Sequence, residues 1–94
     1  VGGEEFLLLL VDTDKQRALS IAESIRKYVE NGMIKTAQGQ QFKITISIGC
    51  TLYDGHPDYQ RFLDAADAAL YMAKNTGRNR VYMAQPPSTP VGQQ

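Results

Sequence analysis

Residues 2–11 read Gly2-Gly3-Glu4-Glu5-Phe6-Leu7-Leu8-Leu9-Leu10-Val11, so that two glycines and two carboxylates precede a continuous apolar run. A Gly-Gly pair directly before a strand is typical of a hairpin turn, because glycine adopts positive φ without a steric penalty. With no side chain at Gly2 or Gly3, a phosphate or base can approach the backbone, and Glu4 and Glu5 offer the hard oxygen ligands that Mg²⁺ prefers. The segment therefore predicts either a magnesium-nucleotide site or a tight turn whose glutamates keep the hairpin tip soluble.

The following residues predict a strand and then a helix. The apolar run from Phe6 to Val11 is short and flanked by turn-forming residues, which predicts a strand buried on both faces. Thr13, with Gln16 three residues later, has the pattern of a capping box at a helix start. Apolar residues then recur at helical spacing up to Asn31-Gly32, where the helix is expected to end: Ala18, Ile21, Ala22, Ile25 and Val29.

The second half of the chain predicts a strand, a helix and a short final strand. After a turn at 38–40, apolar residues alternate with polar ones, which predicts a strand with one buried face that closes at Gly49: Phe42, Ile44, Ile46 and Ile48. A loop at 54–57 follows, and Asp58 is the expected cap of a second helix that ends at Gly77. The apolar stripe of this helix is Phe62, Ala66, Ala69, Leu70 and Ala73. Residues 81–83 predict the last strand.

Composition limits the classes of partner and compartment. The chain has 94 residues, 43% hydrophobic and 21% charged, which suits one small globular domain. Ten basic and ten acidic side chains balance, so no overall field attracts the chain to nucleic acid or to an anionic membrane surface, and we expect neither as a direct partner. No stretch approaches the roughly 18 apolar residues of a membrane span. We expect a cytoplasmic domain, and a membrane anchor elsewhere in a longer protein stays compatible with it.

Two further features concern the single cysteine and the end of the chain. Cys50 is the only cysteine, which excludes an internal disulfide and is compatible with a reducing compartment. Its place after a strand predicts a small buried apolar residue and not a reactive thiol. Residues 85–94 carry no charge and contain three prolines, so we expect a flexible tail or linker there.

Three segments, in this order, resemble the second half of a GGDEF domain, the family of bacterial diguanylate cyclases. They are the Gly-Gly-Glu-Glu-Phe signature at 2–6, the strand end Ile46-Ser47-Ile48-Gly49, and residues 66–79, which read Ala-Asp-Ala-Ala-Leu-Tyr-Met-Ala-Lys-Asn-Thr-Gly-Arg-Asn. The resemblance implies that residues 1–84 are the C-terminal half of an α+β palm domain with a ferredoxin-like sheet.

The resemblance also implies an activity and a site. The enzyme would condense two GTP into cyclic di-GMP, as an antiparallel homodimer controlled by an upstream sensory or receiver domain. Glu4 would bind Mg²⁺ or Mn²⁺ and accept a proton from the attacking 3′-hydroxyl, with Glu5 supporting the metal. Because neighbouring strand residues point to opposite faces, Glu5 shares that metal only if the backbone twists. The other implied site residues bind the nucleotide: Gly2, Gly3, Lys74 and Arg78.

Part of the family's site precedes the Gly-Gly signature, namely a metal-binding aspartate, guanine-reading residues and an inhibitory Arg-x-x-Asp motif. The resemblance implies that the domain's first strand lies between the strand starting at Phe6 and the strand around 44–48. We therefore expect residues 1–94 to be stable only with the upstream half, or as two copies associated through strand edges. Some members carry a further inhibitory arginine where this chain has Ser24, with Arg26 two residues later.

Alternatives exist for the basic residues and for the function. Lys74 and Arg78 lie around the end of the second predicted helix, where cations also interact favourably with the helix dipole. A GGDEF-type module that only senses GTP or cyclic di-GMP, or only dimerises, is the alternative to an enzyme. The intact signature favours the enzyme, because loss of a glycine or of Glu4 would be the simplest mark of a dead site. Residues 1–94 alone are expected to be inactive.

Overall fold

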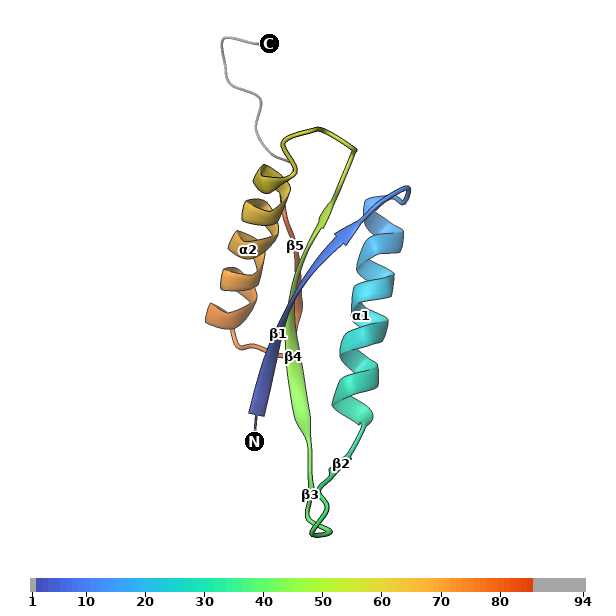
Figure 1. The fold of residues 1–94 in the computed structure, drawn as a ribbon, viewed down its shortest axis with the longest axis vertical. Coiled ribbons are helices and arrows are strands. Elements are labelled where there is room, and N and C mark those ends of the chain that lie inside the picture. The colour runs from blue at the N-terminus through green and yellow to red at the C-terminus, as the bar shows by residue number, and fades with distance from the viewer. Residues whose placement is uncertain (1, 86–94) are drawn as a thin grey trace.

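The computed structural model describes residues 2–85 as two helices and five strands (Figure 1). In chain order these are β1 (Gly2–Leu10), α1 (Lys15–Asn31), β2 (Ile34–Lys35), β3 (Gln41–Phe42), β4 (Ile44–Leu52), α2 (Gln60–Asn75) and β5 (Val81–Met83). The expected mixture of helices and strands is confirmed, and the last strand has the predicted bounds. The tail expected at 85–94 lies outside the described residues from 86 onward.

The main sheet has three parallel strands in the order β1-β4-β5, with one helix on each face (Figure 1). β1 and β4 pair along their whole length, from Gly2 opposite Ile44 to Leu10 opposite Leu52. Strands β2 and β3 form a separate small hairpin around the predicted turn, where Gly39 has a φ of +86°. In the described part of the chain neither helix is both long and apolar enough to cross a membrane.

Strand β4 is the centre of the core, which differs from the expectation of one buried face. All residues from 46 to 51 are buried, because α1 covers one face of the strand and α2 covers the other. On the α1 side, the buried cluster consists of Ala22, Ile46, Ile48 and Cys50. Cys50 is thus buried as predicted, and this burial raises the pKa of its thiol, which keeps it protonated.

Strand β1 corrects two expectations from the sequence. It begins at Gly2, so the two glycines lie in an extended strand and do not form a turn. Its apolar residues are not buried on both faces: Phe6 is 49% exposed and Leu7 is 39% exposed. The reason is that β1 is an edge strand, paired only with β4. β1 and β4 pair directly here, and the strand that the resemblance places between them is expected in the upstream half and not in these residues.

The helix ends also differ in detail from the sequence pattern. The N-cap of α1 is Asp14, whose carboxylate accepts a hydrogen bond from the Arg17 N–H at 2.7 Å, so the predicted capping by Thr13 is wrong. At α2 the N-cap position is Tyr59, with no side-chain cap, and Asp58 does not cap the helix. Aspartate accepts the N3 hydrogen bond at least as well as threonine, which explains the shift by one residue at α1.

Helix α2 packs against the sheet through the predicted stripe. All five of its expected apolar residues are buried. Opposite them, Gly49 of β4 allows the helix backbone to come unusually close: a Cβ at this position would lie 2.2 Å from the Ala66 carbonyl oxygen and 2.4 Å from the Leu70 nitrogen. This close approach sets the distance between α2 and the sheet, and thereby the position in space of the C-terminal end of α2.

Candidate nucleotide-binding site

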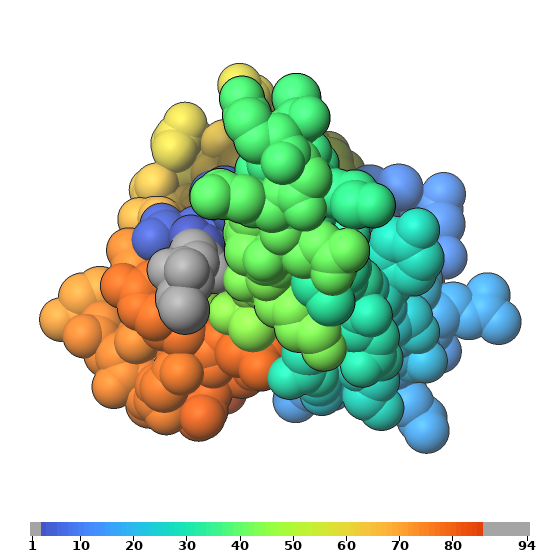
Figure 2. Space-filling model, turned by 90° about the horizontal axis from the view of Figure 1, so that it is seen from below, coloured from blue at the N-terminus to red at the C-terminus, as the bar shows by residue number. Residues whose placement is uncertain are grey.

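A carboxylate and two cations from opposite ends of the chain meet where β1 begins. Lys74 Nζ lies 3.2 Å from one carboxylate oxygen of Glu5, and Arg78 Nη1 lies 3.7 Å from the other. Lys74 is in the last turn of α2, and Arg78 follows that helix. Figure 2, seen from below, shows this end of the molecule, with the start of β1 in blue beside the orange residues around the end of α2.

These ion pairs leave the cations accessible. The side chains of Lys74, Arg78 and Glu5 are 31%, 54% and 41% exposed, respectively. Exposed salt bridges contribute little to stability, about 0 to 1 kcal/mol each. Exchange of the Glu5 carboxylate for a phosphate group would therefore cost little. Two positive charges against one negative charge leave a local excess that suits an anionic ligand.

Glu4 lies apart from this group. Successive residues of a strand alternate between faces, so Glu4 shares the α1 side with Ile46 while Glu5 shares the α2 side with Ser47. The twist that would bring both carboxylates to one metal is not found in the regular strand β1. Glu4 is exposed and makes no ion pair or side-chain hydrogen bond within residues 2–85. In that same part of the chain, no three His, Cys, Asp or Glu side chains are grouped as metal ligands.

Gly3 is an exposed, open stretch of backbone next to both glutamates. A Cβ added to Gly3 would meet no atom within 4 Å, so packing inside the described chain does not require glycine at this position. The contrast with Gly49 is clear, because there the helix backbone fills the space of a Cβ. The backbone at position 3 is therefore open on the surface of the strand.

The turn that carries Arg78 has an unusual backbone. Gly77, Arg78 and Asn79 all have positive φ, at 133°, 61° and 47°. For residues other than glycine this left-handed region costs roughly 1 to 2 kcal/mol each. The helix end is closed by a hydrogen bond from the Arg78 N–H to the Ala73 carbonyl at 2.9 Å. Helix-end capping thus uses the Arg78 backbone, and its side chain is left for Glu5.

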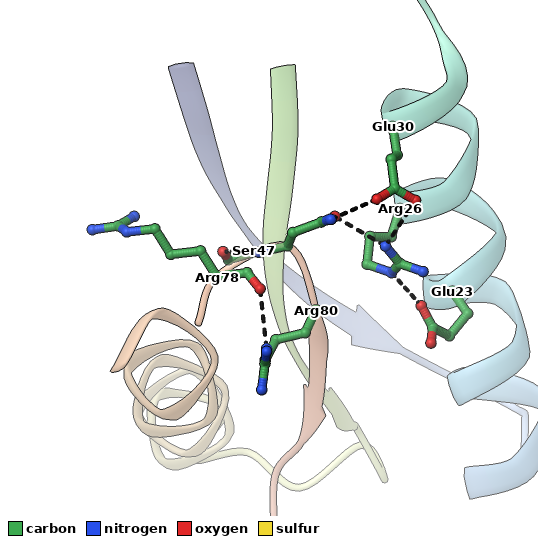
Figure 3. Close-up of polar contacts among 7 residues, drawn as sticks. Glu23, Arg26, Glu30, Ser47, Arg78 and Arg80 are labelled. Atoms are coloured by element: carbon green, nitrogen blue, oxygen red, sulfur yellow. Dashed lines mark hydrogen bonds and ion pairs between the residues drawn. The ribbon is translucent and has the colours of Figure 1, made fainter. Parts of the chain in front are cut away.

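Side chains from α1 and β4 form hydrogen bonds with Asn79 in this turn. Figure 3 labels these partners, Arg26, Glu30 and Ser47. The Asn79 amide oxygen accepts from Arg26 Nη1 at 2.9 Å, and its amide nitrogen donates to Glu30 at 2.6 Å. The backbone N–H of Asn79 donates to the hydroxyl of buried Ser47 at 3.1 Å. The Asn79 hydrogen bond, together with the Arg26 charge, lowers the pKa of Glu30, so this carboxylate stays ionised at neutral pH.

This network was not predicted from the sequence. Arg26 was named only in relation to an inhibitory arginine, but its side chain is 13% exposed and binds Glu23, Glu30 and Asn79. One signal was present: asparagine tolerates the left-handed conformation better than most residues, and here it follows a glycine at a helix end. The long-range partner on α1 gave no pattern of its own.

Comparisons with known proteins agree with this geometry. The family model described as "Diguanylate cyclase, GGDEF domain" matches residues 1–80. Diguanylate cyclase DosC of Escherichia coli K12 is 45% identical over 80 residues, which are 85% of this chain and 17% of DosC. Diguanylate cyclase DgcM of the same strain is 43% identical over 83 residues, or 88% of this chain and 19% of DgcM.

A third relative comes from a distant bacterium. Diguanylate cyclase A of Treponema denticola is 40% identical over 85 residues, which cover 89% of this chain and 23% of that protein. The chain thus spans less than a quarter of the length of each of these three relatives. Because the family model covers most of the 94 residues, and because several cyclases match the same region, this chain belongs to the GGDEF domain family of diguanylate cyclases.

Proposed function

We propose that this chain is the C-terminal half of a complete GGDEF domain that condenses two GTP into cyclic di-GMP. The observation that carries the proposal is the meeting of Lys74 and Arg78 at Glu5, beside the bare backbone of Gly3. In the reaction, the 3′-hydroxyl of each GTP attacks the α-phosphate of the other and pyrophosphate leaves. Two exchangeable cations beside an open strand suit a triphosphate better than they suit a neutral ligand.

The proposed roles follow from what each residue is free to do. Glu4, exposed and unengaged within residues 2–85, fits as one of the one or two carboxylates that hold Mg²⁺ together with substrate phosphates. A divalent ion, Mg²⁺ or Mn²⁺, would neutralise charge developing on the phosphates. Glu4 is also the proposed acceptor of the 3′-hydroxyl proton. Glu5 keeps Lys74 and Arg78 gathered until phosphate takes its place, which is a more specific role than support of the metal.

The second-half assignment and the ferredoxin-like sheet are proposed from the family match, and the parallel direction of β1 and β4 is compatible with both. Phe6 and Leu7 expose apolar surface along this strand, at 49% and 39%, and Val11 directly after it is 57% exposed. A strand inserted between β1 and β4, antiparallel to both, would leave these two strands parallel to each other, as they are here. We propose that the upstream half of the domain supplies this strand, in a cytoplasmic protein that dimerises and carries an upstream sensory or receiver domain.

Arg78→Ala in the full-length protein should weaken GTP binding about tenfold, because a phosphate contact with a charged donor is lost. Titration calorimetry with a non-hydrolysable GTP analogue measures this affinity, and thermal melting is recorded on the same sample. Arg61→Ala, which removes a cation near the start of α2, is the matched control. Unchanged GTP affinity with a lowered melting temperature would instead indicate that Arg78 serves only the helix end.

Residues 1–94 expressed alone should not behave as a stable monomer. The unpaired edge of β1 and its apolar side chains would be exposed to solvent, which favours association through strand edges. Size-exclusion chromatography should show dimers or larger species, and circular dichroism should show a broad thermal transition. Addition of the upstream half as a separate chain should restore one cooperative transition. A folded monomer with cooperative melting would contradict the second-half assignment.

A further inference from the structure

The turn that presents Arg78 is held from the side opposite to its ligand. In Figure 3 the Arg78 side chain extends away from the network that Arg26 and Glu30 make on α1. Asn79, the next residue, points into that network and accepts and donates one hydrogen bond there. Two consecutive residues of one left-handed turn thus have opposite tasks, since one faces Glu5 and the other faces α1.

The network is built to hold a backbone and not to bind an anion. The charge of Arg26 is already matched by Glu23 and Glu30, and its side chain is mostly buried. Ser47, which is 2% exposed, uses its hydroxyl to accept a hydrogen bond from the Asn79 N–H. Arg80 adds a hydrogen bond to the Arg78 carbonyl at 3.0 Å. Hydrogen bonds therefore hold the backbone of the turn at Arg78 and at Asn79, while the Arg78 guanidinium stays exposed.

We propose that Asn79, held by Arg26 and Glu30, is a positioning residue that fixes Arg78 for phosphate binding. This inference rests on the proposed function and adds a residue to it. Without the hydrogen bonds of Asn79 to Arg26 and Glu30, the turn would relax from positive φ, and the Cα–Cβ direction of Arg78 would change. The guanidinium would then leave Glu5 and Lys74, although every residue that contacts the phosphate would still be present.

A double-mutant cycle in the full-length protein separates positioning from general stability. Affinity for a non-hydrolysable GTP analogue is measured by titration calorimetry for Asn79→Ala, Arg78→Ala and the double variant. Asn79→Ala should weaken binding about fivefold to tenfold, within the range of coupling between residues in contact. In the Arg78→Ala background the same change should have almost no further effect, because the side chain that it positions is absent.

Companion variants keep the test decisive if Asn79→Ala folds poorly. Asn79→Gly accepts the left-handed backbone without strain but loses the side-chain hydrogen bonds to Arg26 and Glu30, so it should bind GTP as weakly as Asn79→Ala. Arg26→Gln should act in the same direction without a substitution in the turn, because it removes the Arg26 hydrogen bond to Asn79. Glu23→Gln removes a partner of Arg26 that does not touch Asn79, and it should bind nearly as well as the wild type.

Three results would overturn the inference. Equal losses from Asn79→Ala with and without Arg78 would mean that Asn79 acts on the whole domain and not through Arg78. Wild-type affinity for GTP in both Asn79→Gly and Arg26→Gln would mean that Arg78 binds phosphate without the hydrogen bonds of the Asn79 side chain. If Arg78→Ala itself leaves the GTP affinity unchanged, the proposed phosphate contact of Arg78 fails, and the positioning role of Asn79 fails with it. If Arg78→Ala weakens binding but the Asn79 and Arg26 variants do not, only the positioning role of Asn79 fails.

Discussion

Replacement of Glu4 by Gln in the full-length protein should abolish cyclic di-GMP synthesis, with a loss of at least about 100-fold. General-base catalysis alone contributes about 10²- to 10⁴-fold, and Glu4 is assigned both this role and that of metal ligand. The fold should be unaffected, because the side chain is exposed and has no polar partner within residues 2–85. Product formation from GTP, followed by chromatography at saturating Mg²⁺, measures the loss.

The matched control for this variant is Asp64→Asn. Asp64 is an exposed carboxylate on α2 that accepts only a hydrogen bond from Gln60, so its neutralisation should leave synthesis unchanged. Both variants should melt within a few degrees of the wild type. Retention of synthesis in Glu4→Gln would end the assignment of Glu4 as metal ligand and base, even if the protein still bound GTP.

Gly49→Ala should destabilise the domain by about 3 kcal/mol, the largest stability effect we expect from adding one methyl group. The new Cβ would lie 2.2 to 2.8 Å from backbone atoms of Ala66 and Leu70, which cannot rotate away as a side chain would. Relief requires α2 to move off the sheet, and overpacking of this kind costs about 1 to 3 kcal/mol or more. Urea denaturation followed by circular dichroism measures the change in unfolding free energy.

Gly3→Ala is the matched control, because the same methyl group would meet nothing within 4 Å. Its unfolding free energy should stay within about 0.5 kcal/mol of the wild type. On the proposed function it should nevertheless weaken GTP binding, since the ligand approaches that backbone. A stability loss in Gly3→Ala equal to that in Gly49→Ala would contradict the distinction between a glycine required for packing and one kept open for a ligand.

How far the sequence predicted the fold depended on whether the signal was local. The stripe of α2 was predicted in full because helical spacing needs no knowledge of other elements, and β5 was found at its bounds. The burial of β1 was predicted wrongly because a continuous apolar run has the same pattern in a central strand and in an edge strand. Burial of both faces of β4 was missed because polar Lys43, Thr45 and Ser47 suggested a solvent face, yet Ser47 is buried.

The candidate site was predicted to a similar extent. Lys74, Arg78 and Glu5 came from the family resemblance, and the structure brings them together. The pairing of Glu5 with cations, and not with Glu4, follows from strand alternation, which the signature alone could not decide. Asn79 and its partners on α1 were missed because residues 26 and 79 are neighbours only after folding. Side-chain networks between distant elements leave no periodic pattern in a sequence.

The central claim is that the protein containing this chain makes cyclic di-GMP. The most direct measurement incubates the purified full-length protein with GTP and Mg²⁺ and identifies the products by liquid chromatography and mass spectrometry. We expect cyclic di-GMP with two pyrophosphates for each molecule formed, and no product when EDTA replaces Mg²⁺. Recovery of unchanged GTP from a dimeric protein that binds it would contradict the account and identify a binding module that has kept the fold without the reaction.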